Sequence, residues 1–220
     1  MLDATSAQVY FTLQSEGAMD DLSKALGDIS NIRRQVANST VFRGYGPATL
    51  ACTAGLAAAA STFQARLIPT PAQHVVAYLT LWIITATLAC IIAGWQMYTR
   101  SRRMHSGLSD EMIAMAVQQF LPALGTGFLL SLALTQSAPA SAWLLPGLWQ
   151  MVFALGIFSS CRFMPRAMFA AGAWYLITGL VCIVLGQREP LSPLLMGIPF
   201  GIGQLLIAAI LYTSHAGEEA

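Results

Sequence analysis

The sequence predicts an all-α fold, a polytopic membrane helix bundle of about six transmembrane helices with an amphipathic helix at its N-terminus. Of the 220 residues, 56 % are hydrophobic and only 10 % are charged, and the mean hydropathy is +0.62. A soluble domain carries about 25 % charged residues. The few charges gather in short stretches, which leaves uncharged runs longer than the about 20 helical residues that cross a bilayer. This balance, with a net charge of +1, excludes a soluble enzyme, a disordered protein and a nucleic-acid binder.

Residues 1–43 form the largest extramembrane segment, and we expect them in the cytoplasm. They contain a predicted amphipathic helix over residues 19–37, because apolar residues recur there at steps of three and four. These residues are Leu22, Leu26, Ile29, Ile32 and Val36. Such a helix can lie along the membrane surface, pair with its copy or dock on a partner. Because residues 1–43 hold five acidic and four basic side chains, packing against a partner or the protein body is favoured over simple surface anchoring.

Residues 44–214 form the predicted transmembrane domain, and turn residues divide it into six spans, followed by a tail at 215–220. Pro69 and Pro71 end the first span, because proline disfavours helix at its own position and at the residue before it. The uncharged run 112–161 is too long for one crossing, and the stretch 137–141 divides it. The six spans cover about residues 46–67, 75–98, 113–136, 142–161, 167–187 and 191–214.

The distribution of Lys and Arg predicts the orientation, because loops rich in these residues stay in the cytoplasm. Nine of the eleven lie before span one, after span two or after span four, and only Arg66 and Arg188 lie on the other side. We therefore expect a bacterial inner-membrane protein with both termini in the cytoplasm. The cluster of Arg100, Arg102 and Arg103 is interpreted as a topology determinant, with binding of anionic lipid headgroups as the alternative.

No charged residue lies within the spans except Arg66 at the end of span one, which limits the chemistry that the spans can perform. A charge inside the bilayer usually marks a proton relay, an ion path or a substrate site. The three histidines lie in loops or in the tail, so paired ligands for a transmembrane haem are missing. His105, Asp110 and Glu111 are a candidate metal site, but Ser109 followed by Asp110 and Glu111 fits a helix N-terminus better. We therefore expect a protein that is not an enzyme and that holds neither a metal nor a cofactor.

Amides are the most prominent polar groups left within the spans. The four that we single out are Gln118 and Gln119 in span three, Gln150 in span four and Gln204 in span six. A glutamine in lipid usually bonds to a neighbouring helix, which is the simpler interpretation of all four. If the bundle holds a polar ligand pocket, these glutamines are its expected lining.

Glycine and proline gather in spans three and six, where we expect them to break the helices and to permit close packing. The packing glycines are Gly125, Gly127, Gly197, Gly201 and Gly203. The two spans share the pattern Gly-x-Gly-x-Leu-Leu, at 125–130 and 201–206. Spans two and five share a tryptophan, Trp82 and Trp174, that is followed eight residues later by Cys-Ile. These matches favour a 3+3 inverted repeat, an arrangement known from transporters.

Several stretches resemble a family of uncharacterised bacterial integral membrane proteins. They are residues 32–34 with 39–42, 145–149, 163–167, 172–175 and 197–206, and the likeness covers about residues 25–213. The resemblance implies a short N-terminal helix that bears arginines, about six spans and a last span rich in glycine and proline. The family has no assigned activity, so the resemblance supports the topology and implies no function.

Two functions are compatible with these observations. The first is a non-enzymatic membrane protein that acts by binding, as an accessory, scaffold or sensor component with protein or lipophilic-ligand partners. The second is a small transporter or channel for a neutral or lipophilic substrate, built from the inverted halves. We expect contacts with membrane lipids and with a protein partner or a second copy, through the spans and the N-terminal helix, and none with nucleic acid.

Replacing Leu26 and Ile29 with Asp tests the predicted binding role of the N-terminal helix. Two charges on the apolar face remove the burial that drives docking, so we expect partner association or oligomerisation to fall. Co-purification in mild detergent and size-exclusion chromatography measure the change. Asn31→Asp, which adds a charge on the polar face, is the control. Unchanged association in the variant with both substitutions would contradict the docking role.

Overall fold

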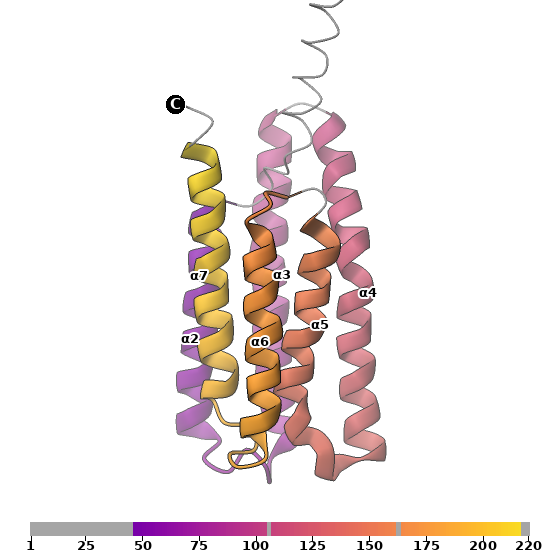
Figure 1. The fold of residues 1–220 in the computed structure, drawn as a ribbon, viewed down its shortest axis with the longest axis vertical. Helices are drawn as coiled ribbons and strands as arrows, with labels where there is room; N and C mark the ends of the chain where they lie inside the picture. Colours follow the sequence, from indigo (N-terminus) through magenta and orange to yellow (C-terminus); the bar gives the residue numbers. More distant parts are fainter. Residues whose placement is uncertain (1–45, 105–106, 162–163, 217–220) are drawn as a thin grey trace, which may run out of the picture. The chain divides into compact units, whose positions relative to one another are not determined.

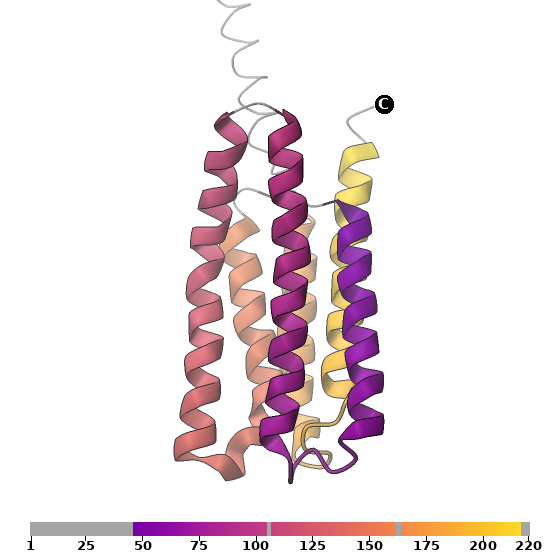
Figure 2. The ribbon, with the colours of Figure 1, turned by 180° about the vertical axis from the view of Figure 1, so that it is seen from behind.

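The computed structural model describes residues 46–104, 107–161 and 164–216 (Figures 1 and 2). The chain divides into two units, Met1–Val41 and Phe42–Ala220, and all described residues belong to the second unit. The predicted helix at 19–37, with its partner-binding residues Leu22, Leu26, Ile29 and Ile32, lies outside the described residues.

Six long helices and one short 3-10 helix make up the described part of the chain, and no strand occurs in it. The predicted fold class, an all-helical membrane bundle, is confirmed. The elements are α2 Pro47–Leu67, α3 Val75–Met104, α4 Gly107–Ser137, η1 Pro139–Leu144, α5 Leu145–Ser160, α6 Met168–Gly186 and α7 Leu194–Ala216.

Five helical segments are long and apolar enough to cross a membrane, which makes the chain a multi-pass membrane protein. They are Val75–Thr99, Gln118–Ser137, Pro139–Ser160, Met168–Gly186 and Leu194–Thr213. α2 has a sufficient length of 21 residues but is less apolar, because it is rich in alanine and hydroxyl side chains and carries Gln64 and Arg66. Its crossing of the membrane stays a prediction, which its packing against α7 supports.

The helices of this unit lie side by side and alternate in direction (Figures 1 and 2). α2 packs mainly against α7 and α3, whereas α5 packs mainly against α6 and α4. Because α6 also packs against α7, the main contacts connect the helices in the order α3, α2, α7, α6, α5, α4. The two helices at the ends of this order, α3 and α4, contact each other only weakly. The two three-helix halves run in opposite directions, as an inverted repeat requires, and the repeat itself stays a prediction.

The segment 99–112, which lies between the second and third predicted spans and was expected as a charged loop, is mostly helical. α3 continues to Met104 and α4 begins at Gly107. The loop expectation is wrong because the segment holds no proline and contains three Arg and two Met, which favour helix. Its charges therefore indicate where a helix leaves the hydrocarbon and do not end the helix. Arg100, Arg102 and Arg103 lie in the last turns of α3, and their side chains are outside the described part.

α4 and α7 continue through Pro122 and Pro199, so the predicted breaks in spans three and six do not occur. A proline inside a helix removes one N–H donor and leaves the carbonyl four residues earlier without its usual partner. A helix in a bundle continues where neighbouring side chains supply that partner. In α7 the carbonyl concerned is that of Leu195, whose new partners are described below.

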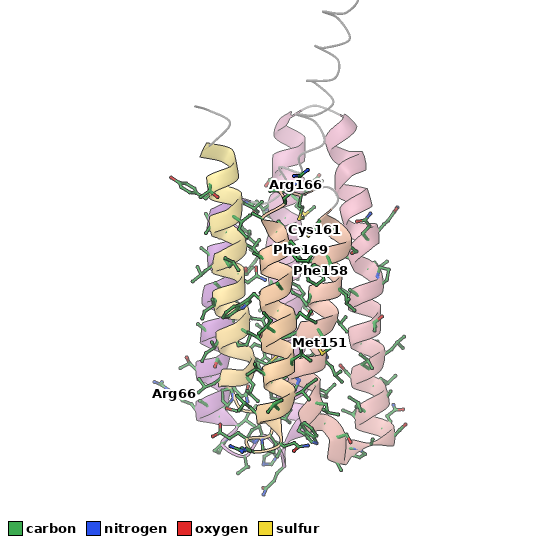
Figure 3. The ribbon with its side chains drawn as sticks, in the orientation of Figure 1. Arg66, Met151, Phe158, Cys161, Arg166 and Phe169 are labelled. Atoms are coloured by element: carbon green, nitrogen blue, oxygen red, sulfur yellow. The ribbon has the colours of Figure 1, made fainter. Side chains whose placement is uncertain are left out.

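Close helix contacts form at glycines, above all between α5 and α6. A Cβ on Gly147 would lie 2.6 Å from the carbonyl oxygen of Gly179, and a Cβ on Gly179 would lie 2.9 Å from that of Gly147. Met151 also packs against Gly179, while Phe158 and Phe169 lie side by side further along the same two helices (Figure 3), with ring centroids 4.9 Å apart. Gly147 and Gly179 therefore allow the backbones of α5 and α6 to approach each other closely.

Two of the glycines predicted from the sequence lie at equally close contacts on α7. Gly197 faces Ser61 of α2, and Gly203 faces Tyr175 of α6, in both cases too closely for a Cβ. Both contacts place α7 against its neighbours in the bundle. The other three lie in open or ordinary surroundings: Gly127 makes van der Waals contact with Trp149, and Gly125 and Gly201 face no described atom within 4 Å of a Cβ position.

Gly179→Ala tests the glycine contact between α5 and α6. The added methyl group meets backbone atoms, which cannot move aside, so we expect a loss of about 1–3 kcal/mol in the free energy of unfolding. Gly201→Ala is the matched control, because its methyl group enters open space and Ala favours helix by about 1 kcal/mol over Gly. Unfolding in detergent, followed by tryptophan fluorescence, measures both. Equal stability of the two variants would contradict the contact.

Candidate functional site

The four glutamines predicted from the sequence lie in different surroundings. Gln118 is exposed at the start of the α4 span, and Gln119 beside it is half-buried. Gln204 of α7 is half-buried and accepts a hydrogen bond from the Thr53 hydroxyl of α2, at 3.3 Å. Gln150 of α5 is fully buried and bonds to groups of α6 and α7. Gln150 and Gln204 therefore make interhelical hydrogen bonds, and a ligand-binding role of the four stays a prediction.

A buried polar cluster lies near the end of the bundle that carries the loops 68–74 and 187–193 (Figure 1). We define the cluster by eight side chains: Ser61, Gln64, Tyr78, Trp82, Ser131, Trp149, Gln150 and Cys182. They come from α2, α3, α4, α5 and α6, and they meet backbone carbonyls at the start of α7 and in the loop before it. The cluster thus joins all six long helices.

The carbonyl of Leu195 is the acceptor that Pro199 leaves without a helical partner, because Pro199 stands four residues later in α7. Two side chains from other helices donate to it instead. Gln150 Nε2 lies 2.7 Å from this oxygen, and Cys182 Sγ lies 3.1 Å from it. Gln150 Nε2 also donates to Cys182 Sγ, at 3.2 Å. The proline in α7 is therefore accommodated by one side chain of α5 and one of α6.

Gln64 and Ser61 of α2 bond in the same manner to the loop that precedes α7. Gln64 Nε2 donates to the Leu191 carbonyl at 2.7 Å, and Ser61 Oγ donates to the Pro193 carbonyl at 2.9 Å. Leu191 has a φ of 58°, in the left-handed region that a leucine rarely adopts, and its side chain is 1 % exposed. Gln64 Oε1 in turn accepts from Trp82 Nε1 at 2.7 Å, so α2 connects α3 to this loop.

Aromatic rings form one side of the cluster. Tyr78 stacks on Trp149 with ring centroids 6.4 Å apart and planes at 11°, and it lies tilted against Trp82 at 6.5 Å. Trp149 Nε1 donates to Ser131 Oγ at 2.8 Å. These contacts fix the Tyr78 ring between α3 and α5.

Two polar atoms of the cluster are buried without a hydrogen-bond partner among the described residues: Tyr78 Oη and Gln150 Oε1. Both side chains have 0 % of their surface exposed. Most buried polar atoms in proteins do have a partner, since an unpaired one keeps its full desolvation cost.

α3 and α4 are the helices that pack least within the chain. Only 11 % of the α3 span and 6 % of the α4 span are buried, against 44 % of the spans in α5 and α7. Their outward surfaces carry large apolar side chains such as Ile91, Trp95 and Phe128. These surfaces meet lipid or another protein.

Each of these two helices also carries a stripe of exposed small or polar residues. The α3 stripe consists of Thr80, Thr87, Cys90 and Gly94, and the α4 stripe of Gln118, Gly125 and Gln136. Thr80 and Thr87 donate only to carbonyls of α3 itself, each at 2.8 Å. Positions seven residues apart share one side of a helix, as do positions three or four apart. No described atom lies within 4 Å of a Cβ position at Gly94 or Gly125.

Within the described ranges, no group of three His, Cys, Asp or Glu side chains is placed to hold a metal ion. His105, considered above with Asp110 and Glu111, lies outside the described residues.

The sequence analysis missed most members of the buried polar cluster. Gln64 lies near the end of its span, and Tyr78 and Cys182 are ordinary residues of apolar helices. One signal was available, because a proline inside a predicted helix frees the carbonyl four residues earlier and so requires a donor nearby. The identity of that donor depends on the packing of helices that are far apart in the sequence.

Comparisons with protein families, with curated proteins and with solved structures return no match for this chain. The resemblance stated from the sequence stays a prediction.

Gln150→Leu tests whether Gln150 serves the carbonyl that Pro199 frees. Loss of this donor leaves Leu195 with the weaker thiol alone, so we expect a cost of about 1–3 kcal/mol in the free energy of unfolding. In a Pro199→Ala background the helix supplies its own N–H, and the cost of Gln150→Leu should shrink. Tryptophan fluorescence during unfolding in detergent measures each variant.

The matched control for this cycle is Gln64→Leu, which removes a donor from Leu191, a residue outside the reach of Pro199. Its cost should be the same in both backgrounds. A cost of Gln150→Leu that Pro199→Ala does not change would show that Gln150 stabilises the bundle for another reason.

Proposed function

We propose that the chain is a bacterial inner-membrane protein that acts by binding, as an accessory, scaffold or sensor component. Its α3 stripe and α4 stripe receive transmembrane helices of a partner, which is a second copy or another membrane protein. The observation that carries this proposal is the poor burial of α3 and α4 in a chain whose other apolar spans are well packed.

The composition of the stripes supports a protein partner over lipid alone. Lipid tails are as apolar as leucine, so a surface that meets only lipid gains nothing from glycine or amide side chains. An exposed glycine lets a second helix approach closely, and an amide in the membrane is best satisfied by a hydrogen bond to another helix. Gly94, Gly125 and Gln118 offer both features on the two least buried helices.

The hydrogen bonds of the buried polar cluster also support a binding role. Gln150, Gln64 and Ser61 donate to backbone carbonyls of this chain. Polar groups that hold helices together in this way build a fixed core, which suits a protein that presents its outer surface to partners.

The expected orientation is part of the proposal. Arg66 lies at one end of the described helices and Arg166 at the other (Figure 3). Arg188 follows α6 at the end where the loop from α2 to α3 also lies. Because nine of the eleven Lys and Arg residues precede α2, lie in the last turns of α3 or follow α5, the positive-inside rule favours a cytoplasmic location for the Arg166 end and the C-terminus.

Oxidative crosslinking at Cys90 tests the α3 stripe. Cys90 is exposed on α3 within one turn of both Thr87 and Gly94, so a second copy that packs there brings two Cys90 thiols together. We expect copper phenanthroline to convert the chain in native membranes to a product of twice its mass, on a non-reducing gel. A Cys90-dependent product of another mass would identify a different partner chain.

Two comparisons make this result specific. Cys90→Ala should abolish the product, whereas Cys52→Ala, which removes an exposed cysteine of α2, should not. Gly94→Leu should lower the yield severalfold, while Gly55→Leu, at an equally open glycine of α2, should leave it unchanged. Absence of any Cys90-dependent product in membranes would contradict binding through this stripe.

A small transporter for a neutral or lipophilic substrate is the second candidate function. It is favoured by the two unpaired polar atoms of the buried polar cluster, which are amide and phenol groups without charge. Proteoliposomes in an isosmotic glycerol gradient should then swell faster than liposomes without protein, and equal rates would count against transport of such a solute.

A further inference from the structure

We propose that the α4 stripe binds α4 of a second copy of this chain, in parallel, and that the Gln118 amide of each copy donates to the Gln118 carbonyl of the other. This contact rests on the function proposed above, because it names the partner of the α4 stripe. Two features of α4 carry it: the proline at position 122, and the depth of Gln118 in the membrane.

Pro122 leaves the Gln118 carbonyl without its usual helical partner, because it stands four residues later inside α4 and has no N–H. Gln118 and Pro122 are both exposed, so this turn of α4 faces away from the other described helices. No side chain of a described residue donates to the carbonyl. The Thr126 hydroxyl, one turn further on, donates to the Pro122 carbonyl instead, at 2.8 Å.

The Gln118 carbonyl lies within the apolar part of α4. Six apolar residues, 112–117, separate Gln118 from Glu111, the last charged residue before the span. The seven helical steps from Glu111 to Gln118 rise about 10 Å, which places the carbonyl below the membrane surface. In hydrocarbon, a helix keeps a proline where a neighbouring helix or side chain satisfies the freed carbonyl. We therefore expect a donor from a helix that packs on this side of α4.

The other proline within a helix of this chain shows which donor suits such a carbonyl. At Pro199 the freed carbonyl of Leu195 accepts from the Gln150 amide, whose Nε2 atom lies 2.7 Å away. Gln118 carries the same amide on the turn where Pro122 frees a carbonyl. One residue of α4 thus offers both the donor and the acceptor of the bond that Gln150 and Leu195 form inside the bundle.

A surface that carries donor and acceptor on one residue complements its own copy. In a two-fold interface the same patch of two subunits meets itself. Copies of one chain insert in one orientation, so a two-fold axis along the membrane normal sets α4 parallel to α4 and Gln118 at the same depth in both. Gly125 lies seven residues later on the same side, and no described atom is within 4 Å of its Cβ position, which permits close approach.

The α3 stripe does not offer this combination of groups. Thr80 and Thr87 donate to carbonyls of α3 itself, each at 2.8 Å, and no proline lies inside α3. Binding through the α3 stripe is therefore a separate question, which crosslinking at Cys90 answers independently.

Crosslinking at position 121 tests the contact between two copies of α4. Leu121 is 61 % exposed and lies three residues after Gln118 and four before Gly125, so it borders the contact. In a Cys90→Ala chain, which cannot crosslink through α3, we expect Leu121→Cys with copper phenanthroline to give a product of twice the chain mass in native membranes. Ile177→Cys, at a 60 % exposed position of α6, should give severalfold less.

Two further substitutions test the bond itself. Gln118→Leu removes the donor and should lower the yield of the Leu121→Cys product severalfold, whereas Gln119→Leu, at the half-buried neighbour, should leave it unchanged. Pro122→Ala restores the helical N–H, so the effect of Gln118→Leu should shrink in that background. Equal yields with Gln118→Leu and Gln119→Leu would overturn the proposed bond.

The outcomes separate this contact from the function on which it rests. A Cys90-dependent product without a Leu121→Cys product of twice the chain mass would overturn the α4 contact and leave binding through α3 intact. A Leu121→Cys product of another mass would overturn the second copy as the partner of α4. Absence of both products would contradict the contact and the function together. If Gln118→Leu is not produced, the Leu121→Cys chain, which keeps Gln118, still decides.

Discussion

A carbonyl group buried in a membrane bundle must accept a hydrogen bond, and the described helices are organised around the Leu195 carbonyl, where Pro199 creates this requirement. Gln150 of α5 and Cys182 of α6 meet it together, which fixes the register of both helices against α7. One layer away, Gln64 bonds to the Leu191 carbonyl and to Trp82, which sets α2 and α3 against the same end of α7. Pro199 thus accounts for the bonds of Gln150 and Cys182 to Leu195, while Gln64 holds the loop that leads into the same helix.

The chain uses its polar residues in two different ways. Gln64 of α2, Gln150 of α5 and Cys182 of α6 point inward and bond to carbonyls of α7 and its preceding loop. The α3 stripe and the α4 stripe, in contrast, remain on the outside. The first group gives the bundle a fixed core. The second group gives it surfaces that a further helix can approach closely. The same bundle therefore combines a rigid interior with outer surfaces on α3 and α4 that are open to a partner.

Local features of the sequence predicted the spans, because hydropathy runs and turn prolines act within a few residues. The same local reasoning failed where the outcome depended on distant partners. It expected Pro199 to break its helix, since no sequence pattern shows that Gln150 and Cys182 are placed to donate hydrogen bonds to the freed carbonyl. It identified Gln150 and Gln204 as interhelical groups from their position in apolar runs. It missed Gln64, whose partner lies 127 residues further along the chain.

The pairing of α2 with the end of the chain has a consequence for biogenesis. α2 is the least apolar of the long helices that pack together here, and it is synthesised before all the others that are described. Ser61 and Gln64 donate hydrogen bonds to the carbonyls of Pro193 and Leu191. These two residues are synthesised just before α7. During synthesis the Ser61 hydroxyl and the Gln64 amide nitrogen therefore lack these acceptors until the loop before α7 is made. The contacts of α2 are complete only when α7 arrives, so the first described helix of the bundle is completed by the last.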